Sequence, residues 1–244
     1  MMVPGSEIRR DRLLLLDIAR TIALFGMVVF HFFRDLEILA LISQGTTLNG
    51  AWAIFARAIA GSFLFLSGVS LVLAHARGFH GKAWLRRFAL ISGAAGLVTA
   101  ATYATFPSQY VFFGILHALS VASLVGVPFL FAPVWVSLIG AALILTASAT
   151  VGRAVFASPW MAWTGLGMEV RASLDFIPIV PWLAPFLLGV ALARMIDTRR
   201  LEPTWPRRFP AQALAWPGRH SLAVYLLHQP VLLALVWLAA MVVQ

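Results

Sequence analysis

The sequence predicts an all-α integral membrane protein, a polytopic bundle of about seven transmembrane helices. Of the 244 residues, 61% are hydrophobic and only 11% are charged, and the mean hydropathy is +0.91. Apolar runs of about 20 residues, the length that crosses a bilayer, recur along the chain. We expect residues 1–244 to form a single membrane domain. The absence of cysteine excludes disulfides, thiol catalysis and thiolate metal sites.

Seven apolar segments are the expected spans, and their connections carry further signals. The spans cover residues 13–33, 51–75, 86–106, 111–131, 133–150, 181–196 and 219–243. Small residues within 61–70 and 92–96 predict close helix packing in the second and third spans. The connection 34–50 is partly apolar and is expected to fold back onto the bundle. The connection 197–218 is rich in proline and arginine and is expected to be a loop.

Proline is concentrated where the sixth span begins. Pro178, Pro181 and Pro185 follow one another at short spacing, and each removes a helical hydrogen bond. Non-helical backbone at membrane depth is tolerated where it is buried in protein or lines a wet cavity. We therefore expect a broken helix at this point.

The net charge of +9 is concentrated in alternate connections, as membrane topology requires. Arginine and lysine precede the first span and fill the connections 76–87 and 194–219. The positive-inside rule then predicts a cytoplasmic N-terminus and an outer C-terminus. We expect an integral membrane protein with the lipid bilayer as partner, and no nucleic-acid partner. The chain is also a candidate homo-oligomer.

The first span carries ionisable side chains that simple anchoring does not need. Asp17, Arg20 and His31 lie in or at the edge of the apolar run. A charge near the bilayer centre costs about 2.5–3.5 kcal/mol on insertion scales, so such residues usually mark a functional site. The alternative is that Asp17 and Arg20 mark one end of the span, and Arg34 and Asp35 the other.

Helical spacing relates these residues to one another. Arg20 and His31 are eleven positions apart, which places them on one face and about 16 Å apart along the axis. Asp17 and Arg20 are spaced to form an i,i+3 ion pair. His31, Arg34 and Asp35 share a face, so Asp35 is a candidate to fix the tautomer of His31.

Two other histidines lie within apolar segments. His117 lies near the outer end of the fourth span, and it is as well explained by a structural hydrogen bond as by catalysis. Ser221, Tyr225 and His228 share one face of the last span and need partners across the bundle. That stripe is either a structural network or part of a site.

Several chemistries have no sequence motif here. The chain has no P-loop, dinucleotide-binding turn, serine nucleophile elbow or zinc-protease motif. No pair of histidines has the His-x-x-x-His spacing of metal ligands, so no metal is expected.

Five pieces of the chain together resemble a known family. They are HFFRDL at 31–36, FLSG at 65–68, FFGILH at 112–117, DFIPIVPW at 175–182 and GRHSLAVYLLHQP at 218–230. LDIAR at 16–20 followed by His31 is similar to the first span of membrane-bound acyltransferases. More closely, the chain resembles the bacterial members of the heparan-α-glucosaminide N-acetyltransferase family.

The resemblance implies transfer of an acetyl group from cytoplasmic acetyl-CoA to an acceptor on the far side, often an amino sugar or other glycan. Longer relatives in lysosomes carry their catalytic histidine in the first outer loop. Here residues 37–50 contain no histidine, so the role passes to His31 or to another group.

These considerations give the candidate residues. We expect His31 as general base with Asp35 as its orienter, and Arg34 and His117 are further catalytic candidates. Acetyl-CoA carries phosphates, so its binding site needs a positively charged entrance. The substrate-binding candidates are Arg20, Arg86, Arg87, Arg199, Arg200, Asp175, Tyr225 and His228. Topology alone also explains the arginines. The rival functions are a transporter with a proton or solute path and a non-catalytic membrane subunit.

Overall fold

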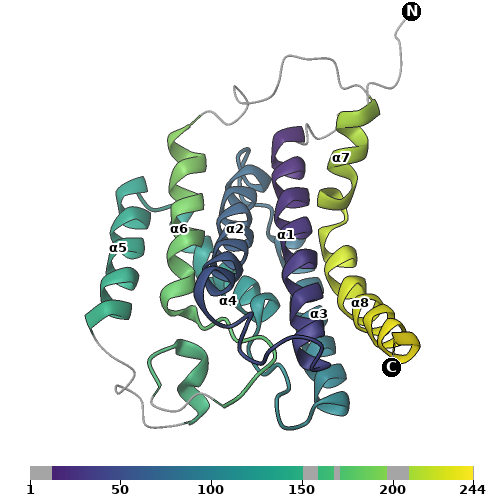
Figure 1. Cartoon of the computed structure of the whole chain (residues 1–244). Helices are drawn as coiled ribbons and strands as arrows, with labels where there is room; N and C mark the ends of the chain where they lie inside the picture. Colours follow the sequence, from purple (N-terminus) through teal and green to yellow (C-terminus); the bar gives the residue numbers. More distant parts are fainter. Residues whose placement is uncertain (1–12, 151–158, 168–170, 197–208, 244) are drawn as a thin grey trace, which may run out of the picture.

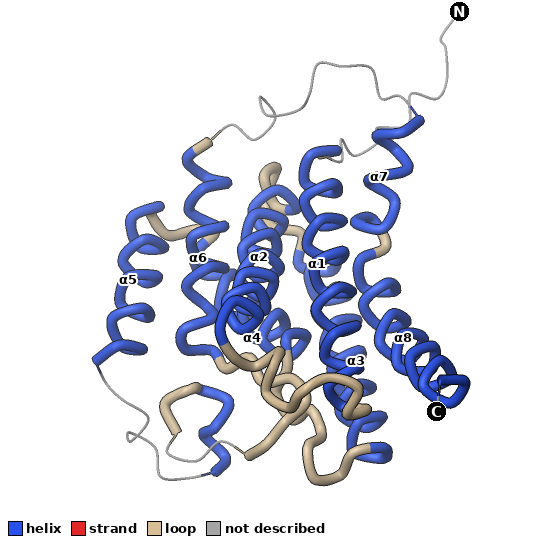
Figure 2. Tube along the Cα trace, in the orientation of Figure 1, coloured by secondary structure: helices blue, strands red, loops and turns tan. Residues whose placement is uncertain are grey.

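The computed structural model describes residues 13–150, 159–167, 171–196 and 209–243, and most of these residues are helical (Figure 1; Figure 2). Within these ranges no β-strand occurs, although an isolated β-bridge joins Phe113 and Phe176. The helices run side by side with successive long helices pointing in opposite directions (Figure 1). The predicted all-α membrane bundle is confirmed.

Each of the seven predicted spans contains one helix, with boundaries that differ by a few residues. The helices are α1 (Leu14–Ile38), α2 (Gly50–Ala74), α3 (Gly81–Thr105), α4 (Ile115–Phe129), α5 (Val134–Thr150), α6 (Ile179–Met195), α7 (Phe209–Arg219) and α8 (Ser221–Val243). A short 3-10 turn at Pro159–Thr164 precedes α6.

Helix length separates two groups. The helices α1, α2, α3 and α8 are long and apolar enough to cross a membrane. The helices α4, α5 and α6 are apolar but have only 15, 17 and 17 residues, fewer than the roughly 20 of a full crossing. Seven crossings therefore stay a prediction.

The helix α7 corrects the sequence analysis, which expected a loop throughout 197–218. Residues 197–208 lie outside the described residues, but Phe209–Arg219 is helical and packs along the first half of α1. A Cβ at Gly218 would overlap the carbonyl oxygen of Asp17, so only glycine fits this contact. The backbone N–H of Gly218 also donates to the Thr21 hydroxyl at 2.9 Å. This tertiary contact stabilises a helix that a proline-rich sequence does not suggest.

The core lies between α2 and α6. Gly68 of α2 packs directly on the backbone of Phe186, and Gly189 of α6 packs on the backbone of Phe65, with no room for a Cβ at either glycine. The prediction of close packing is confirmed for α2. It is wrong for Gly93 and Gly96 of α3, because nothing lies within 4 Å of a Cβ built at either glycine, although Ala94 and Ala95 of this helix pack against Leu116 of α4.

The start of α6 is broken, as the prolines predicted. Val180 has non-helical φ and ψ angles of −97° and 121°, and Pro185 lies within the helix that follows. The extended residues just before α6 pair with the segment before α4, because Leu174 donates to the Gln109 carbonyl at 2.8 Å. This pairing gives the non-helical backbone its hydrogen bonds.

The connection after α1 folds back as expected, and Glu37 holds it. The Glu37 carboxylate is 1% exposed and accepts hydrogen bonds from the backbone N–H groups of Gly45 and Thr47, each at 2.8 Å. It also accepts from the Thr47 hydroxyl at 2.6 Å and from Arg34 at 2.8 Å. Four donors therefore satisfy this buried charge.

Candidate functional site

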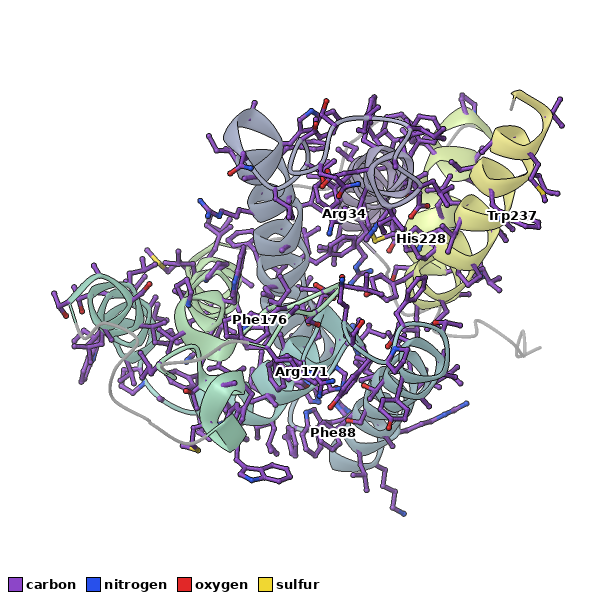
Figure 3. The ribbon with its side chains drawn as sticks, turned by 60° about the horizontal axis from the view of Figure 1, so that its bottom comes forward. Arg34, Phe88, Arg171, Phe176, His228 and Trp237 are labelled. Carbon is purple, nitrogen blue, oxygen red and sulfur yellow. The ribbon has the colours of Figure 1, made fainter. Side chains whose placement is uncertain are left out.

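A cluster of polar side chains joins α1 and α8 in the half of the bundle away from the start of α1. We call it the outer cluster, and it consists of His31, Asp35, His228 and Gln229. The ring centroids of His31 and His228 are 5.0 Å apart and the rings are tilted by 55°. The two helices lie next to each other, and Figure 3 labels Arg34 and His228 on them. His228 thus has a ring contact across the bundle, while its need for a hydrogen-bond partner there stays a prediction.

The hydrogen bonds of His228 define its tautomer. Its Nδ1 lies 2.6 Å from the Tyr225 carbonyl oxygen, and a carbonyl only accepts, so Nδ1 carries the proton. In the neutral ring, Nε2 then has a free lone pair. That nitrogen is buried and has no hydrogen-bond partner among the described residues. His228 therefore presents a fixed, unpaired acceptor inside the cluster.

Asp35 corrects the prediction that it orients His31. Its side chain is fully buried, and its Oδ1 accepts a hydrogen bond from Gln229 at 2.8 Å. No hydrogen bond joins Asp35 to His31 within the described part of the chain. The physical reason is the arrival of α8, whose amide binds the carboxylate in place of the imidazole one turn away. Asp35 Oδ2 and Gln229 Oε1 are buried without partners.

His31 is half-buried, as His228 and Gln229 are, but neither of its ring nitrogens has a hydrogen bond in the described part of the chain. Arg34 lies close enough to act electrostatically on His31 and Asp35. Its guanidinium is nonetheless bound to Glu37, so Arg34 serves the fold of the outer loop. The structure thus brings together His31, Asp35 and His228, and places Arg34 at their edge.

His117, a catalytic candidate, lies in a different network. Its Nδ1 accepts from the backbone N–H of Gly114 at 3.2 Å. Its Nε2 lies 3.3 Å from the Thr99 hydroxyl, which itself donates to the Val111 carbonyl at 2.7 Å. The proton of His117 is therefore on Nε2, and both nitrogens are engaged. This histidine fixes the start of α4.

Asp175, a substrate-binding candidate, also acts at the start of α4. Its Oδ2 accepts from the backbone N–H of Ile115 at 2.8 Å, where a carboxylate suits the helix N-terminus. Burial raises the pKa of Asp175 to about 6, and the hydrogen bond from Ile115 opposes that rise. Tyr225 packs in the core near this carboxylate and holds His228 through its carbonyl.

A second charged cluster, the inner cluster, lies near the start of α1. Asp17 pairs with Arg20 at 3.0 Å, as predicted, and with Arg219 at 3.3 Å. Arg20 also donates to the Ser70 hydroxyl at 2.5 Å, which links α1 to α2. Arg87 of α3 lies close enough to Arg20 for their charges to repel each other. Arg87 therefore adds a second positive charge beside the Asp17–Arg20 ion pair.

The remaining candidates are three arginines that belong to neither cluster. Arg86 is exposed on α3, next to Arg87. Arg199 and Arg200 lie outside the described residues. Within the described residues, no group of three histidine, cysteine, aspartate or glutamate side chains is arranged to hold a metal ion.

Sequence reasoning missed Gln229, Glu37 and Ser70 as members of these networks. Gln229 carried a usable signal, because a glutamine beside a histidine in an apolar helix also needs a partner. Glu37 carried a weaker one, since a lone acid at the end of a span is usually solvated. Ser70 had none, because serine is common in close helix packing.

Comparison with known families brings these observations together. The family model described as "Heparan-alpha-glucosaminide N-acetyltransferase, catalytic" matches residues 12–230. No curated protein and no solved structure matches the chain. The matched range includes all residues of the outer cluster and of the inner cluster. The family implies a transferase, namely a transmembrane acetyltransferase. The chain belongs to the heparan-α-glucosaminide N-acetyltransferase catalytic family.

Proposed function

We propose that this protein moves an acetyl group from cytoplasmic acetyl-CoA to the amine of an extracytoplasmic sugar or other glycan. The observation that carries the proposal is the set of unpaired atoms in the outer cluster. Asp35 Oδ2, His228 Nε2 and Gln229 Oε1 are all acceptors, and all are buried without partners among the described residues. A buried acceptor is costly unless a donor satisfies it. The sugar that receives the acetyl group has N–H and O–H groups, which provide such hydrogen-bond donors.

The chemistry follows from this arrangement. The substrate nitrogen attacks the thioester carbonyl, and an N–C bond forms while His31 takes the proton. The tetrahedral intermediate then collapses, the C–S bond breaks, and CoA leaves as a thiolate that takes the proton from His31, which regenerates the base. We place the base at His31 because neither of its ring nitrogens has a hydrogen-bond partner among the described residues, whereas Nδ1 of His228 is bound to the Tyr225 carbonyl. His228 and Asp35 accept hydrogen bonds from the N–H and O–H groups of the sugar that receives the acetyl group. Gln229 positions Asp35, and the Tyr225 carbonyl positions His228.

The inner cluster suits the phosphates of the donor. Arg20 and Arg87 lie close enough for their charges to interact, at the end of the bundle where the basic connections lie. Along α1, Arg20 and His31 are about 16 Å apart. The pantetheine arm between pyrophosphate and sulfur has about 13 chain atoms, equivalent to roughly four extended residues or about 13–16 Å. Phosphates at Arg20 therefore bring the thioester to the level of His31.

The proposed topology follows the arginine asymmetry. The N-terminus and the connection between α2 and α3 lie in the cytoplasm, and the C-terminus lies outside the inner membrane of a bacterium. An odd number of crossings, seven, is required. Reporter fusions at Gln244 test this, because a reporter active only in the cytoplasm contradicts the proposal.

The donor site has its own test. Arg86, Arg87, Arg199 and Arg200 supply cations for the CoA phosphates, together with Arg20. The double variant Arg86→Ala, Arg87→Ala is expected to raise KM for acetyl-CoA more than it lowers kcat, because charge-assisted hydrogen bonds to phosphate are lost. Unchanged acetyl-CoA affinity contradicts this assignment.

The activity itself is tested with purified protein in liposomes and labelled acetyl-CoA. Glucosamine and glucosamine-bearing oligosaccharides are the acceptors, and N-acetylglucosamine is the matched control because its nitrogen is already acylated. Label is expected to appear only on the free amines. A protein whose melting temperature does not respond to acetyl-CoA, and which labels none of these acceptors, contradicts the proposed function.

A further inference from the structure

Tyr225 and Asp175 form a pair of polar side chains next to the outer cluster. Tyr225 lies on α8 one turn before His228, and the centroids of the two rings are 5.6 Å apart with a tilt of 55°. Asp175 belongs to the extended segment before α6 and lies close enough to Tyr225 to act on it electrostatically. Figure 3 labels His228 and Phe176, the residue after Asp175, at this end of the bundle.

The fold holds the Asp175 carboxylate in one place. The segment that carries it is hydrogen-bonded through its backbone to the segment before α4 on both sides of Asp175. Asp175 Oδ2 accepts from the backbone N–H of Ile115 at 2.8 Å, and a Cβ at Gly114 would overlap this oxygen. The protein itself therefore sets the position of the carboxylate, before any ligand binds.

Each residue of the pair has one polar atom that the fold does not use. Within the described part of the chain, neither Asp175 Oδ1 nor the Tyr225 hydroxyl makes a hydrogen bond, although the two residues are neighbours. Both residues are half-buried, and their free oxygens are not fully buried as Nε2 of His228 is. A tyrosine hydroxyl inside a protein usually has a hydrogen-bond partner. A small polar group from outside the chain can therefore reach both atoms.

The chemistry of the two free atoms matches a hydroxyl group. A carboxylate only accepts hydrogen bonds, whereas a phenol both donates and accepts. A ligand hydroxyl can donate to Asp175 Oδ1 and accept from the Tyr225 O–H at the same time. An ammonium group supplies donors alone and leaves the Tyr225 O–H without a partner, and an ether oxygen leaves Asp175 without one.

We propose that Tyr225 and Asp175 bind one hydroxyl group of the sugar that receives the acetyl group, and so decide which hydroxylated amines are acetylated. On the proposed function, on which this step rests, the amine of the same molecule lies at His31. His228 is in ring contact with both His31 and Tyr225, so the two positions are adjacent. Helix capping by Asp175 does not account for the pair, because the cap uses Oδ2 and does not involve the Tyr225 hydroxyl.

The experiment compares sugars that differ by one hydroxyl group. Acetyl transfer by the full-length protein in liposomes is measured as kcat/KM for methyl glucosaminide and for its 3-deoxy, 4-deoxy and 6-deoxy analogues. For the wild type we expect one analogue to react about 10–100-fold less well, as the loss of a hydrogen bond to a charged group gives. The other analogues should react like the parent sugar.

Variants of the pair sharpen the test. Tyr225→Phe keeps the ring and removes the hydroxyl, so kcat/KM should fall by about 10-fold for the parent sugar and not at all for the sensitive analogue. Asp175→Asn keeps an oxygen for the Ile115 N–H but replaces Oδ1 with a donor, and it should narrow the same difference. Tyr103→Phe is the matched control on the exposed side of α3, and it should change neither rate.

The outcomes separate this inference from the proposed function. Equal rates of the wild type with all four sugars overturn the hydroxyl site and leave the acetyl-transfer proposal intact. An equal loss with every sugar in Tyr225→Phe also overturns the site, because the hydroxyl would then act in the chemistry or the fold. Acetyl transfer to none of these amines contradicts both proposals.

Discussion

His117 and His228 both lie within apolar helices, but they differ in how many of their ring nitrogens are hydrogen-bonded. His117 accepts from Gly114 through one nitrogen and contacts Thr99 through the other. His228 uses one nitrogen on the Tyr225 carbonyl and leaves Nε2 buried and unpaired in the described part of the chain. The same residue type is therefore part of a satisfied network at α4 and part of an incomplete one at α8.

The carboxylates Glu37 and Asp35 repeat this contrast two residues apart on α1. Glu37 accepts from four donors, whereas Asp35 accepts from Gln229 through Oδ1 and has no partner on Oδ2. Complete hydrogen bonding stabilises a fold, and incomplete hydrogen bonding in a buried place is retained where a substrate completes it. The comparison predicts that the two groups respond differently to mutation.

The largest effect is expected at His31. His31→Ala should lower kcat by at least about 10²-fold, because a positioned general base contributes about 10²–10⁴-fold. Membrane insertion and acetyl-CoA affinity should stay as in the wild type. Full acetyl transfer by this variant, together with an inactive but folded His117→Ala, would transfer the role of base to His117.

The next effect is expected at His228. His228→Ala should lower kcat/KM for the acceptor by about 10–100-fold, because a buried acceptor for the substrate N–H is lost. The double variant with His31→Ala should be little worse than the worse single variant, since residues that act as one unit are not additive. Fully multiplicative losses would show that the two histidines act independently.

A smaller effect is expected at Asp35. Asp35→Asn keeps the shape but gives the cluster a donor in place of an acceptor, and the rate should fall by about 10-fold, the equivalent of one hydrogen bond. Glu37→Gln is the matched control, and it should lower the melting temperature while leaving the rate per folded molecule nearly unchanged. The reverse result, a stable inactive Glu37→Gln, would contradict the contrast between the two carboxylates.

The smallest effect on the rate is expected at His117. His117→Ala should leave kcat of the folded protein within about threefold of the wild type, yet cost about 1–3 kcal/mol of stability because the Gly114 N–H loses its partner. Thermal unfolding in detergent and the acetyl-transfer rate, measured on the same sample, separate the two quantities. A rate loss without any loss of stability would assign chemistry to His117.

Much of the fold was predictable because hydropathy and periodicity are local properties. The positions of seven apolar helices, the Asp17–Arg20 pair and the folded-back loop after α1 follow from residues close together in the chain. The helix α7 was not predictable, because its sequence contains proline and its stability comes from the contact of Gly218 with α1. Close packing of α2 was predicted correctly, and the same pattern failed at Gly93 and Gly96 of α3, because these two glycines face away from the helices that α3 contacts.

The sequence by itself determined that His31 and Arg20 share one face of α1 about 16 Å apart, since helix geometry depends on spacing alone. It also determined that His228 and Tyr225 share a face of the last helix. Only the tertiary structure decided that His31 lies against His228, and that Asp35 binds Gln229, 194 residues further along the chain, in preference to His31. Contacts between distant helices depend on how whole surfaces pack, and no local pattern in the sequence specifies which of two nearby partners a buried carboxylate will bind.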